Sequence, residues 1–302
     1  EIYTLSLHDA LPISSLDSER IGKRERSMVK LENGYLPETL MEALEIRAAE
    51  RVVPYAGGTD LMVEAAEDAT YLFLNQLPEL SRVRVTDDTL EIGAGCTYTE
   101  LLNHEAVPQV LKDAMSLIAS PATRNQATPA GNICNASPKA DSALIFVAAG
   151  ARLRLRSVSG ERIVPISEFF IDRGKTCLRE DELLTEILMP RRGVDNYYYK
   201  KIGARAAMAI SRVSFVAIYG EADGRIERMS IAFGAVSGVV LRFPEVEAMM
   251  IGKTIPEAKK IKADFLKEYD DRIVPIRGRV SATYRKQVCM NLLNDFLESR
   301  GI

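Results

Sequence analysis

The chain has 302 residues, 47% of them hydrophobic and 27% charged, a balance typical of a globular protein with room for one large domain or two packed units. Its net charge of -3, without a basic block or a basic helical stripe, argues against nucleic acid as a partner. No apolar run reaches the ~18 residues of a membrane span, and the four scattered cysteines form no metal-binding spacing, so we expect reduced thiols in a cytoplasmic protein.

We do not expect residues 1–27 to belong to the folded protein. They lack the basic start and unbroken apolar run of a signal peptide, because polar residues interrupt them. Residues 3–13 resemble one translated frame of a sequencing-adapter oligonucleotide, and the polar segment that follows reads as translated upstream sequence. We therefore expect a non-native leader over 1–27, with Met28 as the start. His104 is then the only native histidine, which argues against a histidine-based triad or a zinc site.

The chain up to residue 157 mixes helical and strand patterns. Apolar spacing, glycines and alternation locate the elements. In order, we expect a helix at 36–44 with Pro37 near its first turn, strands at 51–56 and 70–75, a hairpin at 82–95, helices at 99–104 and 108–118, a polar loop at 127–140, an apolar helix from Asp141 and a strand at 151–157.

The composition changes near Arg192. Residues 211–236 read as two long strands joined at Asp223 and Gly224, a strong hairpin pattern. Two helices, at 256–269 and 281–299, close the chain. We expect an α+β protein with a first domain at 28–192 and a smaller C-terminal domain of antiparallel sheet plus helices at 193–302.

A first glycine loop, "YAGGTDL", follows an expected strand. Gly57 and Gly58 lack a Cβ and can take positive φ values, so another group can approach the main chain closely. Their N–H groups and the Thr59 hydroxyl suit an anion such as a diphosphate. A plain turn is the alternative reading. The loop contains neither the dinucleotide motif GxGxxG nor a P-loop.

A second loop, "TPAGNICNASPKAD", supplies the neutral hydrogen-bonding groups of Thr128, Asn132, Asn135 and Ser137, with Asp141 about one helical turn later. Neutral donors suit an anionic ligand, and a carboxylate at the far end can accept from ribose hydroxyls. The alternative is an Asn/Ser-rich turn in which Asp141 only caps a helix. Two such loops in one α+β unit favour a dinucleotide cradle.

These residues resemble the FAD-binding subunit of the molybdenum hydroxylases, the group of xanthine dehydrogenase, nicotinate dehydrogenase and aerobic carbon monoxide dehydrogenase. "AGGTDL" at 56–61 is similar to the family's first FAD loop. Residues 118–141, "IASPATRNQATPAGNICNASPKAD", are similar to its second, I-G-x-x-x-x-R-N-x-A-T-x-G-G-N-I-x-x-x-S-P-x-x-D. The resemblance runs in order over 28–302. It implies a two-subdomain FAD-binding domain of the CO dehydrogenase flavoprotein type, followed by the C-terminal domain.

The resemblance also implies roles for individual residues. The FAD diphosphate would be wrapped by Val53, Pro54, Tyr55, Ala56, Gly57, Gly58, Thr59, Asp60 and Leu61. Thr128, Gly131 and Asn132 would continue the cradle, and Asn135, Ser137 and Asp141 would approach the ribose and the rest of the dinucleotide. Ile118 would border the flavin ring, and Leu184 would pack near the adenine or the ring system.

Two further residues follow the expected domain boundary. Tyr199 would cover one flavin face, with an ordinary strand tyrosine as the alternative. Lys201 would lie near the polar edge of the flavin, where a positive charge favours the reduced, anionic form. Two departures affect the second loop: Ala130 replaces the usual first glycine, and Pro129 replaces an aliphatic residue and removes one N–H donor.

The implied function is electron transfer, with no catalytic side chain and no metal site on this chain. A large partner subunit would carry molybdopterin, a small one would carry two [2Fe–2S] clusters, and FAD would deliver a hydride to NAD+ in a xanthine dehydrogenase-like cytoplasmic heterotrimer. This chain lacks the cysteine patterns of such clusters. Two alternatives remain open, a self-sufficient FAD-dependent oxidoreductase of related fold and an assembly subunit that has lost FAD.

Overall fold

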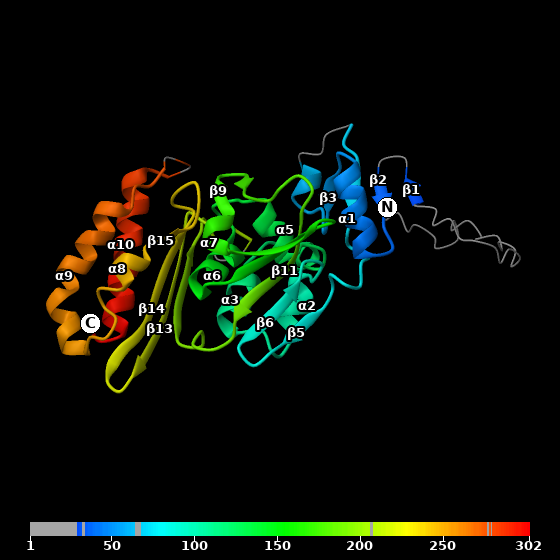
Figure 1. The fold of residues 1–302 in the computed structure, drawn as a ribbon. Helices are drawn as coiled ribbons and strands as arrows, with labels where there is room; N and C mark the ends of the chain where they lie inside the picture. Colours follow the sequence, from blue (N-terminus) through cyan, green and yellow to red (C-terminus); the bar gives the residue numbers. More distant parts are fainter. Residues whose placement is uncertain (1–28, 32–33, 64–67, 206–207, 277, 279) are drawn as a thin grey trace, which may run out of the picture.

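The computed structural model describes residues 29–31, 34–63, 68–205, 208–276, 278 and 280–302. The expected leader at 1–27 lies outside the described residues. Three parts follow one another across the molecule: a small N-terminal sheet with a helix, a central sheet with helices, and a C-terminal sheet with two long helices (Figure 1). The α+β class predicted from the sequence is confirmed.

The N-terminal part is a four-stranded sheet with one covering helix. Its strands, in spatial order, are β1 (Val29–Leu31), β2 (Gly34–Leu36), β4 (Tyr71–Phe73) and β3 (Val53–Tyr55). The pairs of β4 with β2 and with β3 are parallel. Helix α1 (Leu40–Ala49) begins after Thr39, whose hydroxyl accepts from the Glu42 amide. Pro37 therefore precedes the helix rather than lying in its first turn. A 3-10 turn, η1 (Leu61–Val63), follows the first glycine loop.

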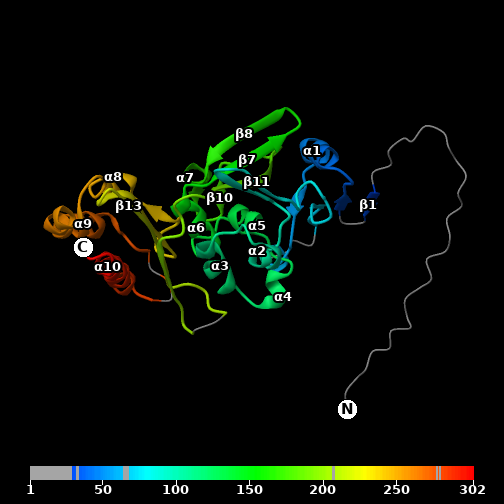
Figure 2. The ribbon, with the colours of Figure 1, turned by 90° about the horizontal axis from the view of Figure 1, so that it is seen from below.

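The central part is an antiparallel five-stranded sheet with helices packed against it. Its strands, in spatial order, are β5 (Val83–Val85), β6 (Thr89–Gly93), β11 (Leu183–Pro190), β7 (Arg152–Ser157) and β8 (Gly160–Pro165). Its helices are α2 (Tyr98–Asn103), α3 (Gln109–Ser116), α4 (Pro121–Arg124), α5 (Pro129–Cys134), α6 (Asp141–Ala149) and α7 (Ile166–Phe169), and β9 (Phe170–Asp172) pairs with β10 (Lys175–Thr176). Seen from below, the helices of the central part lie between the N-terminal part and the C-terminal part (Figure 2).

The C-terminal part is an antiparallel sheet whose order is β12 (Tyr197–Ile202), β13 (Val213–Ala222), β14 (Arg225–Gly234) and β15 (Leu241–Arg242). The predicted hairpin of β13 and β14 is present, and both Asp223 and Gly224 have positive φ. Helices α8 (Pro244–Glu247), α9 (Ile255–Arg272) and α10 (Ala282–Ser299) belong to the same end of the molecule (Figure 1). A second hydrophobic core forms between this sheet and its helices.

Helix α6 joins the central and C-terminal parts. All of its residues are buried, and it packs against α3, β11, β13 and β14. Its C-terminal carbonyls accept side-chain hydrogen bonds from the C-terminal sheet: Ser230 Oγ donates to Ala148 at 2.6 Å, and Arg242 donates to Val147 at 3.2 Å. The Val147 carbonyl also accepts from the Gly150 amide at 3.1 Å, whereas the Ala148 carbonyl, in the last turn of the helix, depends on Ser230. The C-terminal sheet therefore caps a helix of the central part.

Ser230→Ala is expected to lower the free energy of unfolding by about 1–2 kcal/mol, because it removes a buried donor and leaves the Ala148 carbonyl unpaired. Urea unfolding followed by circular dichroism measures the change. Ser159→Ala, at an exposed turn, is the control and should have little effect. Equal stability of the two variants would contradict the capping role.

The four cysteines, Cys96, Cys134, Cys177 and Cys289, are free and lie in different surroundings. Burial raises the pKa of the Cys134 thiol to about 12, so this residue remains a protonated thiol although it lies within the second loop motif. In the part of the chain that the structure describes, no helix combines the length and apolar character needed to cross a bilayer.

Candidate functional site

The two loops singled out in the sequence meet in space. Gly57 lies so close to residues 126–127 that an added Cβ would overlap the Gln126 carbonyl oxygen and lie 3.0 Å from Ala127 Cα. Residue Ala127 is itself held by α2, because its carbonyl accepts from the Tyr98 amide at 3.0 Å. Glycine at 57 is thus required by contact between two backbones, and the first loop is joined to the segment that leads into Thr128.

The first loop turns sharply after β3. Gly58 has φ of 65°, in the left-handed region that glycine tolerates best. Its carbonyl accepts from Met62 at 2.9 Å, which closes the turn into η1, and the Tyr55 ring folds back against Gly58. The loop residues from Val53 to Leu61 are half-buried except Asp60, which is exposed. The loop is therefore fixed yet partly accessible.

The second loop is more ordered than the sequence suggests. In place of a plain polar loop, α5 begins after Thr128, whose Oγ accepts from the Gly131 amide at 3.0 Å. Pro129 occupies the first helical position, where its missing N–H costs nothing. Ala130 is buried within the helix, where a Cβ is tolerated. Both departures from the family pattern thus fit the local structure.

Asn132 is oriented by a hydrogen-bond chain behind it. The Ser142 hydroxyl donates to Asn132 Oδ1 at 2.8 Å, and Tyr98 Oη lies 2.8 Å from Ser142 Oγ. Tyr98 and Ser142 are both fully buried. Because Oδ1 is occupied, the half-buried amide presents its Nδ2 group, which can only donate. This arrangement suits a ligand oxygen.

Asp141 and Lys201 form a buried ion pair. Lys201 Nζ lies 2.8 Å from Asp141 Oδ2, and the side chains are 8% and 5% exposed. The Ser211 hydroxyl donates to Asp141 Oδ1 at 2.7 Å, and Lys201 also donates to the Leu117 carbonyl at 2.8 Å. Asp141 balances the positive charge of Lys201, so the pair adds little net charge to a nearby ligand. The roles predicted for both residues toward FAD stay predictions.

The segment around Ile118 is held by a residue that the sequence analysis did not single out. Arg124 donates to the carbonyls of Ile118 at 2.7 Å and Ala119 at 3.1 Å. Ala119 has φ of 46°, an unfavourable conformation for alanine, so this turn depends on such support. The second FAD loop pattern of the family has arginine at this position, so the resemblance could have identified Arg124 in the sequence.

Tyr199 carries an unpaired buried hydroxyl. Its Oη is inaccessible to solvent and has no hydrogen-bond partner among the described residues. Burial, and then the charges of Asp141 and Asp113, raise the pKa of this phenol, so it remains a neutral donor. A buried donor without a partner is costly, and a ligand acceptor at this place would satisfy it.

The other predicted residues take separate places. Asn135 is exposed at the end of α5, and Ser137 Oγ accepts from the Lys139 amide at 3.3 Å. Leu184 is different: it is buried in the core on β11, the strand against which α5 packs. The structure thus gathers both loops, whereas Leu184 supports the scaffold beneath them.

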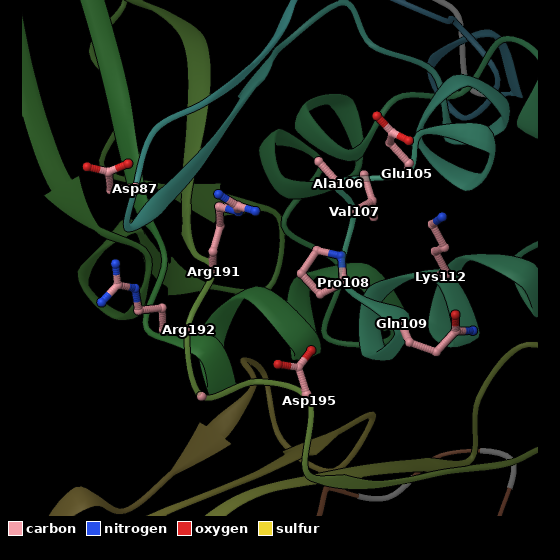
Figure 3. Close-up of a pocket in the computed structure, with 11 residues that line it drawn as sticks. Asp87, Glu105, Ala106, Val107, Pro108, Gln109, Lys112, Arg191, Arg192 and Asp195 are labelled. Carbon is pink, nitrogen blue, oxygen red and sulfur yellow. The ribbon is translucent and has the colours of Figure 1, made fainter.

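A surface hollow of about 660 Å³ has a lining separate from these loop residues (Figure 3). The hollow lies between residues 191–195, which link the central and C-terminal parts, and residues 105–108, which precede α3. None of the predicted site residues is part of its lining. Its charged side chains are balanced: Lys112, Arg191, Arg192, Asp87, Glu105 and Asp195. Arg191 is bonded to the Thr86 carbonyl and Arg192 to Asp88. This charge pattern indicates no single ligand class.

Two family models together match most of the chain. Residues 30–192 match the family described as the FAD binding domain in molybdopterin dehydrogenase, and residues 197–299 match the CO dehydrogenase flavoprotein C-terminal domain. The nicotinate dehydrogenase FAD-subunit of Eubacterium barkeri is 28% identical over 268 residues, 84% of this chain and 90% of that protein. The xanthine dehydrogenase FAD-binding subunit of Escherichia coli O157:H7 is 31% identical over 221 residues, 69% and 75% of the two chains.

Solved structures share the fold. A chain of carbon monoxide dehydrogenase from Hydrogenophaga pseudoflava, which lacks the Mo-pyranopterin moiety of the molybdenum cofactor, superimposes with a TM-score of 0.79 at 24% identity, covering 87% of this chain and 94% of that chain. A chain of quinoline 2-oxidoreductase from Pseudomonas putida 86 gives 0.79 at 19% identity, covering 90% and 97%.

Proposed function

The chain belongs to the FAD-binding subunits of the molybdenum hydroxylase family, and from this premise we propose that it holds one FAD between its two loops and transfers electrons within an oxidoreductase complex. The contact of Gly57 with residues 126–127 carries the proposal, because it joins the loops into one cradle. The oriented amide of Asn132 and the unpaired hydroxyl of Tyr199 support it, since each is a hydrogen-bond donor that a ligand oxygen could pair with. These residues fit a bound dinucleotide.

The protein residues bind and orient the cofactor. Backbone N–H groups near Gly57 and Gly58 would face the diphosphate, and Asn132 Nδ2 would donate to a ligand oxygen. The paired Asp141 and Lys201 hold the C-terminal sheet against the second loop. Bound FAD supplies the redox chemistry, because it accepts electrons singly and releases them as a pair.

The proposal extends to partners. A large subunit with molybdopterin would oxidise the substrate, and a small subunit with [2Fe–2S] clusters would pass single electrons to this chain. We propose NAD+ as the acceptor and a cytoplasmic heterotrimer of the xanthine dehydrogenase type. The names of the relatives, FAD subunits of nicotinate and xanthine dehydrogenases, support membership of such an assembly. Anaerobic addition of NADH to the flavin-loaded chain tests the acceptor, since bleaching of the flavin absorbance is the expected result.

Reconstitution of the purified chain with FAD tests the central proposal. We expect one tightly held FAD per chain, visible as flavin absorbance after gel filtration, and no turnover of small substrates by the chain alone. A protein that stays colourless after addition of FAD would instead indicate an assembly subunit that has lost the cofactor. Turnover by the isolated chain would indicate a self-sufficient flavoenzyme.

Asn132→Leu is expected to weaken FAD binding by about 1–3 kcal/mol, because it leaves a ligand oxygen without its donor. Titration of the apoprotein by quenching of flavin fluorescence measures the change. Asn291→Leu, on the exposed side of α10, is the control and should retain the affinity of the unmodified chain. Thermal unfolding of both apoproteins separates a binding defect from a loss of stability, since Asn132 also accepts from Ser142.

A further inference from the structure

The turn that ends the second loop is held by one contact within the central part and one from the C-terminal part. The carbonyl of Ala136 accepts from the Gly174 amide at 3.0 Å, and the carbonyl of Pro138 accepts from the Ala235 amide at 2.6 Å. Ser137, predicted to approach FAD, lies between these two contacts. The position of Ser137 therefore depends on the backbone at Ala235, just after β14.

The backbone is strained at Ala136 in the turn and at Ala235, which contacts the turn. Ala136 has φ of 48° and Ala235 has φ of 63°. Alanine is unfavourable in this left-handed region because its Cβ crowds the neighbouring carbonyl, so such residues persist only where surrounding contacts hold them. Ala235 is fully enclosed in the protein. Its conformation requires contacts on its carbonyl side as well as its amide side.

Arg285 of α10 supplies that second contact. Its Nη1 donates to the Ala235 carbonyl at 2.6 Å, and the whole residue is only 4% exposed. Gly278 lies against it: an added Cβ there would overlap the guanidinium, with the Arg285 Cζ at 3.2 Å. A charged donor makes a stronger hydrogen bond than a neutral one. The guanidinium thus fixes Ala235, and Ala235 fixes Pro138.

We propose that Arg285 is a positioning residue for the FAD-binding loop, acting through Ala235 on the turn at Ser137 and Pro138. The inference rests on the proposed function, since it assumes that this loop contacts FAD. Coupling of this kind is reciprocal: if Arg285 orders the loop for FAD, bound FAD must also stabilise the start of α10. Helix α10 lies in the C-terminal part, far along the chain from both glycine loops (Figure 1).

Substitution of Arg285 is the first test. Arg285→Met keeps the length and removes the donors, and it should raise the Kd for FAD about tenfold. Arg285→Lys retains a charged donor and should restore most of the affinity. Lys286→Met, at a neighbouring half-exposed ion pair with Asp270, is the control and should bind as the unmodified chain does. A Kd for Arg285→Met equal to that of the unmodified chain overturns the proposal.

Hydrogen exchange on the unmodified full-length chain is the second test, and it applies even if Arg285→Met fails to fold. FAD should slow amide exchange at residues 234–236 and 281–289 in addition to the two loops. Protection confined to residues 53–61 and 118–141 overturns the proposal. Failure of the unmodified chain to bind FAD would reject the proposed function, whereas normal binding by Arg285→Met rejects only the role of Arg285.

Discussion

Gly57→Ala is expected to reduce FAD affinity by a hundredfold or more, although it adds a single methyl group. The new Cβ would overlap the Gln126 carbonyl oxygen and approach the Gln126 carbonyl carbon to 2.6 Å, and both belong to backbone that cannot rotate away. The loops would have to separate, and overpacking of this kind costs ~1–3 kcal/mol before any loss of ligand contacts. Since ~1.4 kcal/mol is a factor of ten in affinity, the two losses together reach the expected range.

Gly220→Ala is the matched control for that substitution. A Cβ at Gly220 would lie 3.4 Å from the Arg228 Cβ, which is an ordinary contact, and the residue belongs to β13. We expect this variant to bind FAD with unchanged affinity in the same fluorescence titration. Full flavin occupancy and unchanged affinity in Gly57→Ala would show that the cradle does not depend on close approach of the two loops.

Local pattern was sufficient for much of the fold. The β13–β14 hairpin follows from alternation around Asp223 and Gly224, and α6 follows from an apolar run with Asp141 at its start. The short helices α4 and α5 were missed, because a polar run of small residues reads as a loop. Both carry a local signal, a capping hydroxyl followed by proline: Ser120 before α4 and Thr128 before α5.

The site was only partly predictable for a different reason. Candidate residues in the two loops, such as Gly57 and Asn132, can be singled out from their own segment of sequence. Residues that act through long-range contacts cannot: Ser142 orients Asn132 while bonded to Tyr98, 44 positions away, and Arg285 reaches Ala235 over 50 positions. Their partners become neighbours only after the sheets have assembled.

Lys201→Met is expected to destabilise the folded apoprotein by about 3–5 kcal/mol, the second large effect. Lys201 Nζ and Asp141 Oδ2 are 2.8 Å apart in a nearly solvent-free position, so removal of the ammonium leaves a buried carboxylate supported by the Ser211 hydroxyl. The Leu117 carbonyl also loses its donor, at the end of α3 next to Ile118. Urea unfolding measures the loss, and Lys200→Met, an exposed neighbour on the same strand, should change stability by less than about 1 kcal/mol.

The double variant Asp141→Asn, Lys201→Met decides what the ion pair contributes. If the cost of Lys201→Met is the stranded charge, a neutral amide at position 141 that still accepts from Ser211 should recover a large part of the stability. If the cost is lost packing of the lysine stem, the double variant should be no more stable than Lys201→Met. Recovery would mean that the ion pair contributes little net stability, and FAD affinity measured on that variant would then report how far a net-neutral pair influences the cofactor.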